Sequence, residues 1–332
     1  MRQLTRWPRL LVRWAKVLAG KSYYHQPQHL GKAFVPNELA GYFNDLTAKT
    51  RWPGHTDGEG VPINALDDGR RVYFVTTIVQ KALGHWDKWL LTQDDTDRKI
   101  FLKLCRWLLL RQDGHGGWPF WSELGIRISS PYSAMTQGEC ISAFVRAWQL
   151  TGDPEFAEGA KRALELMRMP IGEGGPMIAD DKGLFLEEMP ADPRSSILNG
   201  WIFAIFGVYD FWLAFKDESA LDLFEISLVS LKSHLQDYDV GYWSRYDVQG
   251  HLASSFYHDL HIQQLTAVSM IDDDPLFSEF RELWIQYKRS RKNRIRALVS
   301  NLSSPKFRHI TSQDNDSLCA VGTMSNLEKQ DT

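Results

Sequence analysis

The chain has 332 residues, of which 43% are hydrophobic, so it is long enough for one large domain or two small ones with a sizeable core. Its formal net charge of −3 argues against a general nucleic-acid binder. The 3 cysteines, Cys105, Cys140 and Cys319, are an odd number without CxxC spacing, which indicates a reducing compartment and no disulfide framework.

The N-terminal segment is strongly basic. Residues 1–21 carry six lysines and arginines and no acidic residue, and basic residues flank and interrupt the apolar run from Leu10 to Trp14. A secretion signal needs an uninterrupted apolar core, so this segment does not fit one. Two interpretations stay open: a basic amphipathic helix on the anionic inner face of a membrane, or a helix packed on the domain through Trp and Leu. We expect a basic arm over residues 1–35 and a cytoplasmic protein.

The rest of the chain is mostly helical in pattern. Residues 22–70 are irregular, with one short helix expected near 37–48. From Val72 onwards, apolar residues recur at three- and four-residue intervals. The helices predicted from this spacing cover 72–90, 95–111, 132–150, 154–168, 196–215, 218–236, 257–271 and 275–297. Asp153–Pro154 and Asp274–Pro275 mark tight joints, because Asp caps a helix and Pro suits its first turn.

These helices repeat as helix, tight joint, helix and long loop, restarting about every 60 residues. Helical hairpins of this kind must stack to bury their apolar faces, and four of them can close into a toroid with the long loops at one end. An open helical array is the alternative. We expect an all-α fold over residues 36–300: an α/α toroid of about four helical hairpins, with short β-hairpins in the loops that line the cleft. Residues 301–332 are polar and without periodicity, which predicts a disordered tail.

Just before the tail, six basic residues lie between Lys288 and Arg296. Such a run usually forms a solvated helix face. It can also attract an acidic polymer or an anionic membrane.

Two of the long loops contain residues suited to sugar binding or acid/base chemistry. Trp118 follows two glycines, a pattern that suits either a platform for a sugar ring or a tight turn around a buried Trp. Glu187 and Glu188 precede a proline in the second loop and fit either an acid/base group or a solvated pair of acids.

The third loop and the helix after it hold the densest group of polar aromatic residues. Tyr246 and Asp247 lie in a predicted hairpin around Gly250, and Tyr257 and His261 share one face of the following helix. This group can move protons and bind a polar ligand; the alternative is that the rings bond to nearby backbone groups. The histidines lack HExxH spacing and a third ligand, so we expect no metal site. A phosphate loop and a nucleophile elbow are both absent from the sequence, which argues against nucleotide cofactors and acyl transfer.

Four runs carry a resemblance to a known family: SPYSAMTQGECISAFVRAWQLTGDPEF (130–156), EEMPADPRSSILNGWIFAIFGVYD (187–210), SRYDVQGH (244–251) and YHDLHIQQLTAVSMIDDDPLFSEF (257–280). They resemble the C-terminal domain of D-glucuronyl C5-epimerase, which modifies heparosan in heparan sulfate synthesis. The resemblance extends more loosely upstream through GVPINA (60–65), YFVTTIVQKAL (73–83) and DGHGGWPF (113–120). It implies an α/α toroid, and a shorter bacterial form, because the segment from Phe43 to Val72 is too short for the β-rich domain of animal members.

The resemblance also implies roles for residues. The family's catalytic tyrosines, in a YD motif and a YHxxH motif, match Tyr246 and Tyr257, and its catalytic glutamate, in an EEYP motif, matches Glu188. The implied reaction is C5 epimerisation of hexuronate residues in a polysaccharide, of the D-glucuronate to L-iduronate type, without a cofactor. Tyr257 and Glu188 would act as opposed acid and base, and Tyr246 would donate to the substrate carboxylate.

Eight further residues are expected to bind substrate or support the base: Trp118, Tyr132, Gln137, Arg194, Asn199, Arg245, His258 and His261. Among them, His258, His261 and Arg245 are the expected partners that would make Tyr257 basic. The sequence departs from the family where Met189 replaces the tyrosine of EEYP and Gln249 replaces an arginine, with Gly250 inserted. Both lost groups help to hold the substrate carboxylate, so the resemblance does not by itself make heparosan the substrate.

Other functions stay open at this point. A uronate polysaccharide lyase begins with the same proton removal and then expels the 4-O substituent, and a hydrolase would need two opposed carboxylates. A catalytically impaired glycan-binding member is the non-enzymatic alternative. In each case the expected partner is an acidic polysaccharide that contains hexuronate. No nucleic-acid partner is expected, and a homodimer is among the expected assemblies.

Overall fold

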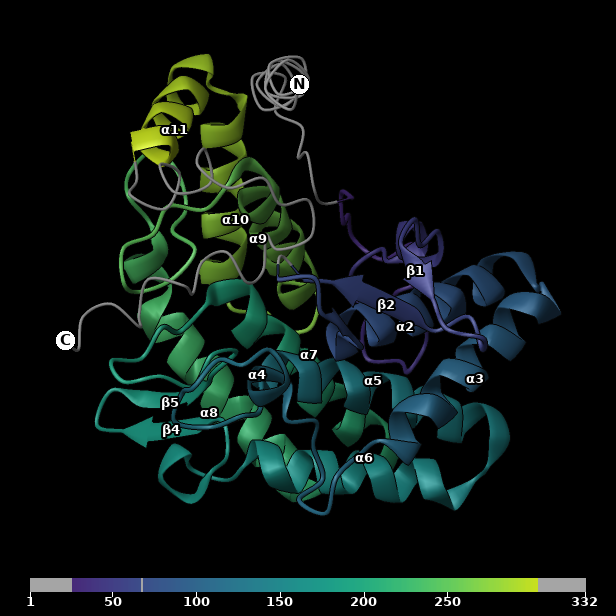
Figure 1. Cartoon of the computed structure of the whole chain (residues 1–332). Helices are drawn as coiled ribbons and strands as arrows, with labels where there is room; N and C mark the ends of the chain where they lie inside the picture. Colours follow the sequence, from purple (N-terminus) through teal and green to yellow (C-terminus); the bar gives the residue numbers. More distant parts are fainter. Residues whose placement is uncertain (1–25, 67, 304–332) are drawn as a thin grey trace.

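The computed structural model describes residues 26–66 and 68–303, and four helical hairpins follow one another along this part of the chain (Figure 1). They are α2 (Val75–Thr92) with α3 (Asp95–Leu110), α5 (Ala134–Thr151) with α6 (Pro154–Met167), α7 (Leu198–Phe215) with α8 (Glu218–His234), and α9 (Ser255–Val268) with α10 (Pro275–Arg289). The two helices of each hairpin pack against each other. The predicted succession of helix pairs is therefore confirmed.

The second helix of every hairpin begins at an aspartate whose side chain accepts a hydrogen bond from a backbone N–H of the first turn. These caps are Asp94, Asp153, Asp217 and Asp274. Pro154 and Pro275 occupy the first position of their helices, where a missing N–H costs nothing. Each cap stabilises its helix by about 1 kcal/mol, which explains why the chain turns so tightly at these joints.

The first helices of the hairpins lie side by side. α5 packs against α2 and α7, and α7 also packs against α9. α5 and α7 touch at two glycines: a Cβ atom on Gly207 would lie only 2.3 Å from the Cα atom of Gly138. Any larger side chain at this crossing would push the two helices apart. By length and hydropathy α7 could cross a membrane, but 78% of it is buried within the protein, as in the core helix of a helical array.

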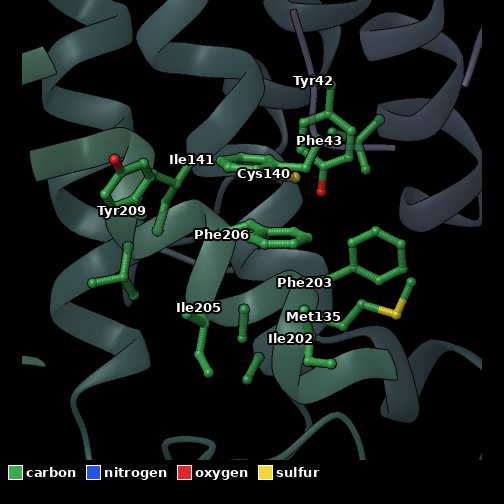
Figure 2. Packing of buried hydrophobic residues seen from close by; sticks show 14 of the residues in the cluster. Tyr42, Phe43, Met135, Cys140, Ile141, Ile202, Phe203, Ile205, Phe206 and Tyr209 are labelled. Carbon is green, nitrogen blue, oxygen red and sulfur yellow. The ribbon is translucent and has the colours of Figure 1, made fainter. Parts of the chain in front are cut away.

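The segment before α2 completes the ring. The N–H of Leu30 donates to Gln263 Oε1 on α9 at 3.1 Å, and the N–H of Tyr42 donates to Asp87 Oδ1 on α2 at 2.8 Å. Next to Tyr42 the segment packs against the middle of α7: Phe43 stacks on Phe206 with ring centroids 4.0 Å apart (Figure 2). The four hairpins and this segment together form the α/α toroid expected from the sequence.

The aromatic residues of this segment also explain a wrong prediction. No helix forms near 37–48; Asn37 has a φ of 63°, and the segment reaches only the 3₁₀-helix η1 (Thr47–Thr50). Tyr42 and Phe43 are both buried in the core. Their apolar side chains pack against the helices of the ring and do not form the apolar face of a helix of their own. A three-stranded antiparallel sheet that the sequence did not predict follows: β1 (His55–Thr56), β2 (Pro62–Ala65) and β3 (Arg71–Val72).

The long loops contain short elements. The predicted hairpin around Asp181–Gly183 is confirmed as β4 (Met177–Asp180) and β5 (Gly183–Leu186). The predicted hairpin around Gly250 contains only isolated pairs, Asp239 with Ser244 and Arg245 with Leu252. The other short elements are α4 (Phe120–Glu123), η2 (Ile171–Glu173) and η3 (Leu235–Tyr238). Loops with these elements precede α5, α7 and α9, the first helices of their hairpins. They therefore gather at the end of the ring where these helices begin.

The C-terminal helix predicted over 275–297 is two helices. α10 ends at Arg289, and α11 (Arg291–Ser303) begins after Ser290, whose backbone is extended with ψ 117°. Residues 301–303, predicted as the start of the tail, belong to α11. Residues 1–25 and 304–332, with most of the basic arm, Cys319 and the rest of the tail, lie outside the described residues.

Candidate active site

The loop between β5 and α7 places two neighbouring carboxyl groups in different surroundings. Glu187 is fully buried and completely bonded: Oε1 accepts from the Ser196 hydroxyl at 2.5 Å, and Oε2 accepts from the Ser196 N–H at 2.8 Å and the Ser195 hydroxyl at 3.2 Å. Glu188 has a buried Oε2 atom without any hydrogen-bond partner. Glu187 therefore anchors the loop, and Glu188 has the carboxyl group available to a ligand.

The space that Glu188 occupies is created by Gly200 in the first turn of α7. A Cβ atom on Gly200 would lie 2.2 Å from Oε2 of Glu188, so only glycine fits there. Burial, followed by the charge of Glu187, raises the pKa of Glu188 to about 8. A carboxyl group with this pKa holds its proton at neutral pH and is suited to act as an acid.

Tyr246 and Tyr257 lie together beside this carboxyl group. Their ring centroids are 4.7 Å apart. Burial raises the pKa of Tyr246 well above its usual value, and the negative charge of Glu188 and the hydrogen bond with Tyr257 raise it further. The two phenols are thus hydrogen-bonded to each other, and Tyr246 stays protonated.

Backbone hydrogen bonds fix the two loops to each other. The N–H of Leu198 donates to Tyr246 O at 3.0 Å, and the N–H of Val248 donates to Ser195 O at 3.1 Å. The Tyr238 hydroxyl also donates to Ser196 O at 2.6 Å. The structure therefore brings Glu188, Tyr246 and Tyr257, the three predicted catalytic residues, to one place beside the N-terminal ends of α7 and α9.

Glu139 on α5 is a buried carboxyl group that the sequence reasoning missed. Its Oε1 atom accepts from Gln80 Nε2 at 2.8 Å, and its Oε2 atom is buried without a partner. Burial raises its pKa to about 8; the bond from Gln80 and the charge of Lys49 lower it, and the charge of Glu188 raises it. The sequence did contain a signal for a buried carboxyl group, because Glu139 is the only acidic residue within the apolar helix 134–151.

Two amides add further unpaired oxygen atoms to this region. Gln264 Nε2 on α9 donates to Asn199 O at 3.0 Å, next to Gly200, while Gln264 Oε1 and Asn199 Oδ1 are buried without partners. A buried acceptor without a partner costs about 1–3 kcal/mol, so a water molecule or a ligand normally satisfies such groups. Together with Glu139 and Glu188, these amides suit a ligand rich in hydroxyl groups. The role of Asn199 in substrate binding stays a prediction.

Three predicted sugar contacts are hydrogen-bonded within the protein. Trp118 is buried and its Nε1 donates to Leu108 O at 3.1 Å, the Tyr132 hydroxyl donates to Asp113 Oδ2 at 2.7 Å, and Gln137 Nε2 donates to Gly116 O at 3.1 Å. These bonds attach the loop 112–133 to its neighbouring helices. The interpretation of Trp118 as a buried ring in a tight turn, rather than as a sugar platform, agrees with the structure.

The two predicted arginines are also held by the protein. Arg194 lies over the Phe185 ring at 3.7 Å and pairs with Asp180 at 3.3 Å, and its charge acts on Glu187. Arg245 Nη1 donates to Asp237 O at 3.0 Å. That Arg194 replaces the arginine lost at Gln249 stays a prediction.

Both ring nitrogens of His258 have partners in this fold, whereas His261 Nε2 is buried without a hydrogen-bond partner. His258 stacks on Trp243 at 3.7 Å, its Nδ1 lies 2.8 Å from Ser244 Oγ, and its Nε2 lies 3.1 Å from Trp284 O. Burial lowers its pKa to about 3, and burial holds the pKa of His261 well below its usual range. Both rings are neutral at physiological pH. The sequence predicts them as cations or hydrogen-bond donors for Tyr257; burial excludes the positive charge, and the role of donor stays a prediction.

The two positions that depart from the family pattern differ in environment. Met189 is buried in an apolar cluster with Phe120, Trp121 and Ile197. Gln249 is exposed, and its Nε2 donates to Pro193 O at 3.2 Å. Across residues 26–66 and 68–303, no three His, Cys, Asp or Glu side chains gather as metal ligands would.

Comparison with known proteins gives consistent matches. The family model of the D-glucuronyl C5-epimerase C-terminus matches residues 112–286. A D-glucuronyl C5-epimerase of Caenorhabditis elegans is 29% identical over 245 residues, which cover 64% of this chain and 40% of that protein. An uncharacterized protein of Methanocaldococcus jannaschii is 28% identical over 155 residues, 46% of this chain and 50% of that one. The chain therefore spans half or less of the length of these relatives.

Among solved structures, an unsaturated glucuronyl hydrolase from Bacillus sp. GL1, responsible for the degradation of glycosaminoglycan, aligns with a TM-score of 0.44 and 18% identity. The alignment covers 68% of this chain and 62% of that one. The family model, in contrast, covers more than half of the chain and includes Glu188, Tyr246 and Tyr257. On this evidence the chain belongs to the D-glucuronyl C5-epimerase family.

Proposed function

We propose that this protein is an isomerase that inverts C5 of hexuronate residues, of the D-glucuronate to L-iduronate type, within a polysaccharide. The observation that carries the proposal is the convergence of a protonated carboxyl group, Glu188, with the hydrogen-bonded phenols of Tyr246 and Tyr257. Family membership supports it. An acid and a base from separate loops are what inversion at carbon needs, because a single group would only restore the starting sugar.

The reaction begins with removal of the C5 proton, which is acidic because C5 adjoins the carboxylate. Tyr257 takes this proton, and the C–H electron pair moves into an enediolate. In this mechanism Tyr246 donates the hydrogen bond between the two phenols, which stabilises the phenolate that Tyr257 needs as a base. Glu188 then delivers its proton to C5 from the other face, and the electron pair forms the new C–H bond.

The cycle closes when a proton passes from Tyr257 to the ionised Glu188. Tyr246 is placed for this transfer, because it bonds to Tyr257 and its pKa responds to the charge of Glu188. No oxidation occurs and no group leaves, so the proposed reaction needs no cofactor.

The enediolate carries extra negative charge, which donors must stabilise. The N-terminal end of α7 supplies them. Its cap residue, Ile197, has no side chain that bonds the first-turn N–H groups, the N–H of Leu198 donates to Tyr246 O, and Gly200 of that turn lies against Glu188. A helix N-terminus favours negative charge by about 0.3–1 kcal/mol when exposed and by more when partly buried. This end of α7 compensates in part for the arginine replaced by Gln249.

Deuterium incorporation tests the proposal. The protein is incubated in deuterated water with unsulfated glucuronate polymers such as heparosan, and the sugars are analysed by mass spectrometry and NMR. We expect deuterium at C5 and an intact chain. Unsaturated chain ends would indicate a lyase instead, and binding without exchange on any polymer would indicate an impaired glycan-binding member.

Restoring the family's groups is a second test. Gln249→Arg is expected to raise the exchange rate without loss of stability, because residue 249 is exposed. Met189→Tyr places a hydroxyl group in the apolar cluster of Phe120 and Trp121, which costs about 1–3 kcal/mol unless that hydroxyl faces substrate. Rates that stay unchanged in both variants would show that these two positions do not limit the reaction.

A further inference from the structure

A groove lies on the outer side of the last three helices, which are together at one end of the molecule (Figure 1). Its volume is about 490 Å³. The polar residues that line it are Ser255, Asp259, Gln263, Lys288, Arg289 and Arg294. They come from α9, α10 and α11, so the break between α10 and α11 at Ser290 shapes the groove.

The charge of this groove is not neutralised by the protein. Lys288 pairs with Asp259 at 2.8 Å. Within the described part of the chain, Arg289 and Arg294 are exposed and have no carboxylate within the 4.0 Å of an ion pair.

The surface around the groove is also positively charged. Residues 283–303 contain six basic residues and no acidic residue, although the whole chain has a net charge of −3. Arg291 and Lys292 are exposed next to the groove, and Arg296 lies over the Tyr242 ring at 3.8 Å. Unpaired cations concentrated along a concave surface produce a local positive potential that attracts a polyanion.

The groove begins close to the candidate active site. Ser255 and Asp259 lie on the face of α9 that lines the groove, whereas Tyr257 and Gln264 lie on the opposite face of the same helix. Ser255 and Tyr257 are two residues apart in the first turn. A linear polymer that leaves the site across the N-terminal end of α9 can therefore continue into the groove.

We propose that Arg289 and Arg294 hold an acidic polysaccharide chain beyond the sugar that reacts, so that the groove is a second binding region for the polymer. The proposal rests on the proposed function for the identity of the polymer. A concave groove lined by Ser255 and Gln263 suits hydroxyl and carboxylate groups of a chain better than a flat membrane surface. The basic N-terminal arm has the same sign of charge as the groove and does not fit as its occupant.

The test compares two double variants of the full chain. Arg289→Gln with Arg294→Gln removes the unpaired cations of the groove, and Lys99→Gln with Lys161→Gln removes two exposed lysines from α3 and α6 as a matched control. All four positions are exposed, so both variants should fold normally. Binding to unsulfated heparosan is measured over a range of salt concentrations, and C5 exchange is measured on a short oligosaccharide.

We expect the groove variant to bind the polymer about tenfold more weakly at low salt, with the difference disappearing at 1 M salt because exposed charges are then screened. The control variant should bind as the unaltered protein does. Exchange on the short oligosaccharide should be the same in all three, because it occupies only the site at Glu188 and Tyr257.

Equal polymer affinity in the two variants, or no polymer binding by the unaltered protein, overturns the proposal. So does a groove variant that keeps its affinity for the polymer but loses affinity for vesicles of anionic phospholipid, since the surface then serves a membrane. Absence of C5 exchange together with binding that depends on Arg289 and Arg294 contradicts the proposed function alone. Exchange without such dependence contradicts the groove alone.

Discussion

Glu187 and Glu188 are adjacent in the chain, yet only the carboxyl group of Glu187 is bonded by the protein. Ser195 and Ser196 donate three hydrogen bonds to it, while Oε2 of Glu188 is buried without a partner against Gly200. The first arrangement fixes the loop, and the second leaves an acid free for a ligand. The difference between the two residues can be measured directly.

Glu188→Gln is expected to keep the fold and to lower C5 exchange by about 10²–10⁴-fold, because the proton donor is lost. Glu187→Gln is expected to lower the free energy of unfolding by about 1–3 kcal/mol, because an amide cannot accept all three bonds. Denaturant unfolding and exchange rates measured on both variants check this. The assignment is wrong if Glu188→Gln retains full exchange.

Tyr246→Phe removes the donor that favours ionised Tyr257. The exchange rate should fall by about 10²–10³-fold, and the acidic limb of its pH profile should move to higher pH because the pKa of Tyr257 rises. Tyr209→Phe is the control, since this hydroxyl donates to Asn37 at the other end of the ring. A lowered rate with an unmoved profile would mean that Tyr246 acts on substrate and not through Tyr257.

Glu139→Gln should become more stable than the parent protein as pH rises. The pKa of Glu139 is about 8 in the fold and near 4.5 when unfolded, so the folded state loses stability relative to the unfolded state between these values. Glutamine has no such loss. The free energy of unfolding of the variant relative to the parent should therefore increase by up to about 1.4 kcal/mol per pH unit and level off above pH 8. Thermal unfolding at pH 5, 7 and 9 measures it, and a constant difference would contradict the raised pKa.

His258→Gln tests whether the imidazole is structural. Its pKa of about 3 lies below the unfolded value, so the parent protein loses stability as pH falls from about 6.5 towards 3, by up to about 1.4 kcal/mol per unit from this ring. The variant should lose less over that range. Its C5 exchange at pH 7 should stay near that of the parent. A large loss of exchange with normal stability would instead show that His258 acts on the substrate.

Local patterns in the sequence determined the helices and several joints. Apolar spacing and the Asp153–Pro154 and Asp274–Pro275 joints act over four or five residues, so they predict helix pairs before any tertiary contact is known. Motif resemblance also brought Glu188, Tyr246 and Tyr257 onto one list. It also selected Glu188 rather than Glu187 through the EEYP motif, but it did not show that Ser195 and Ser196 bond the carboxyl group of Glu187.

What only the tertiary structure decided is which polar groups are already bonded. His258 meets Ser244 and Trp284, Glu139 meets Gln80 across 59 residues, and Leu30 closes the ring on Gln263 across 233 residues. Burial and hydrogen bonding set the charge of each group, and both come from partners far away in the chain. The sequence therefore named the candidates for proton transfer, whereas the fold decided the burial and the hydrogen-bond partners that set the charge of each.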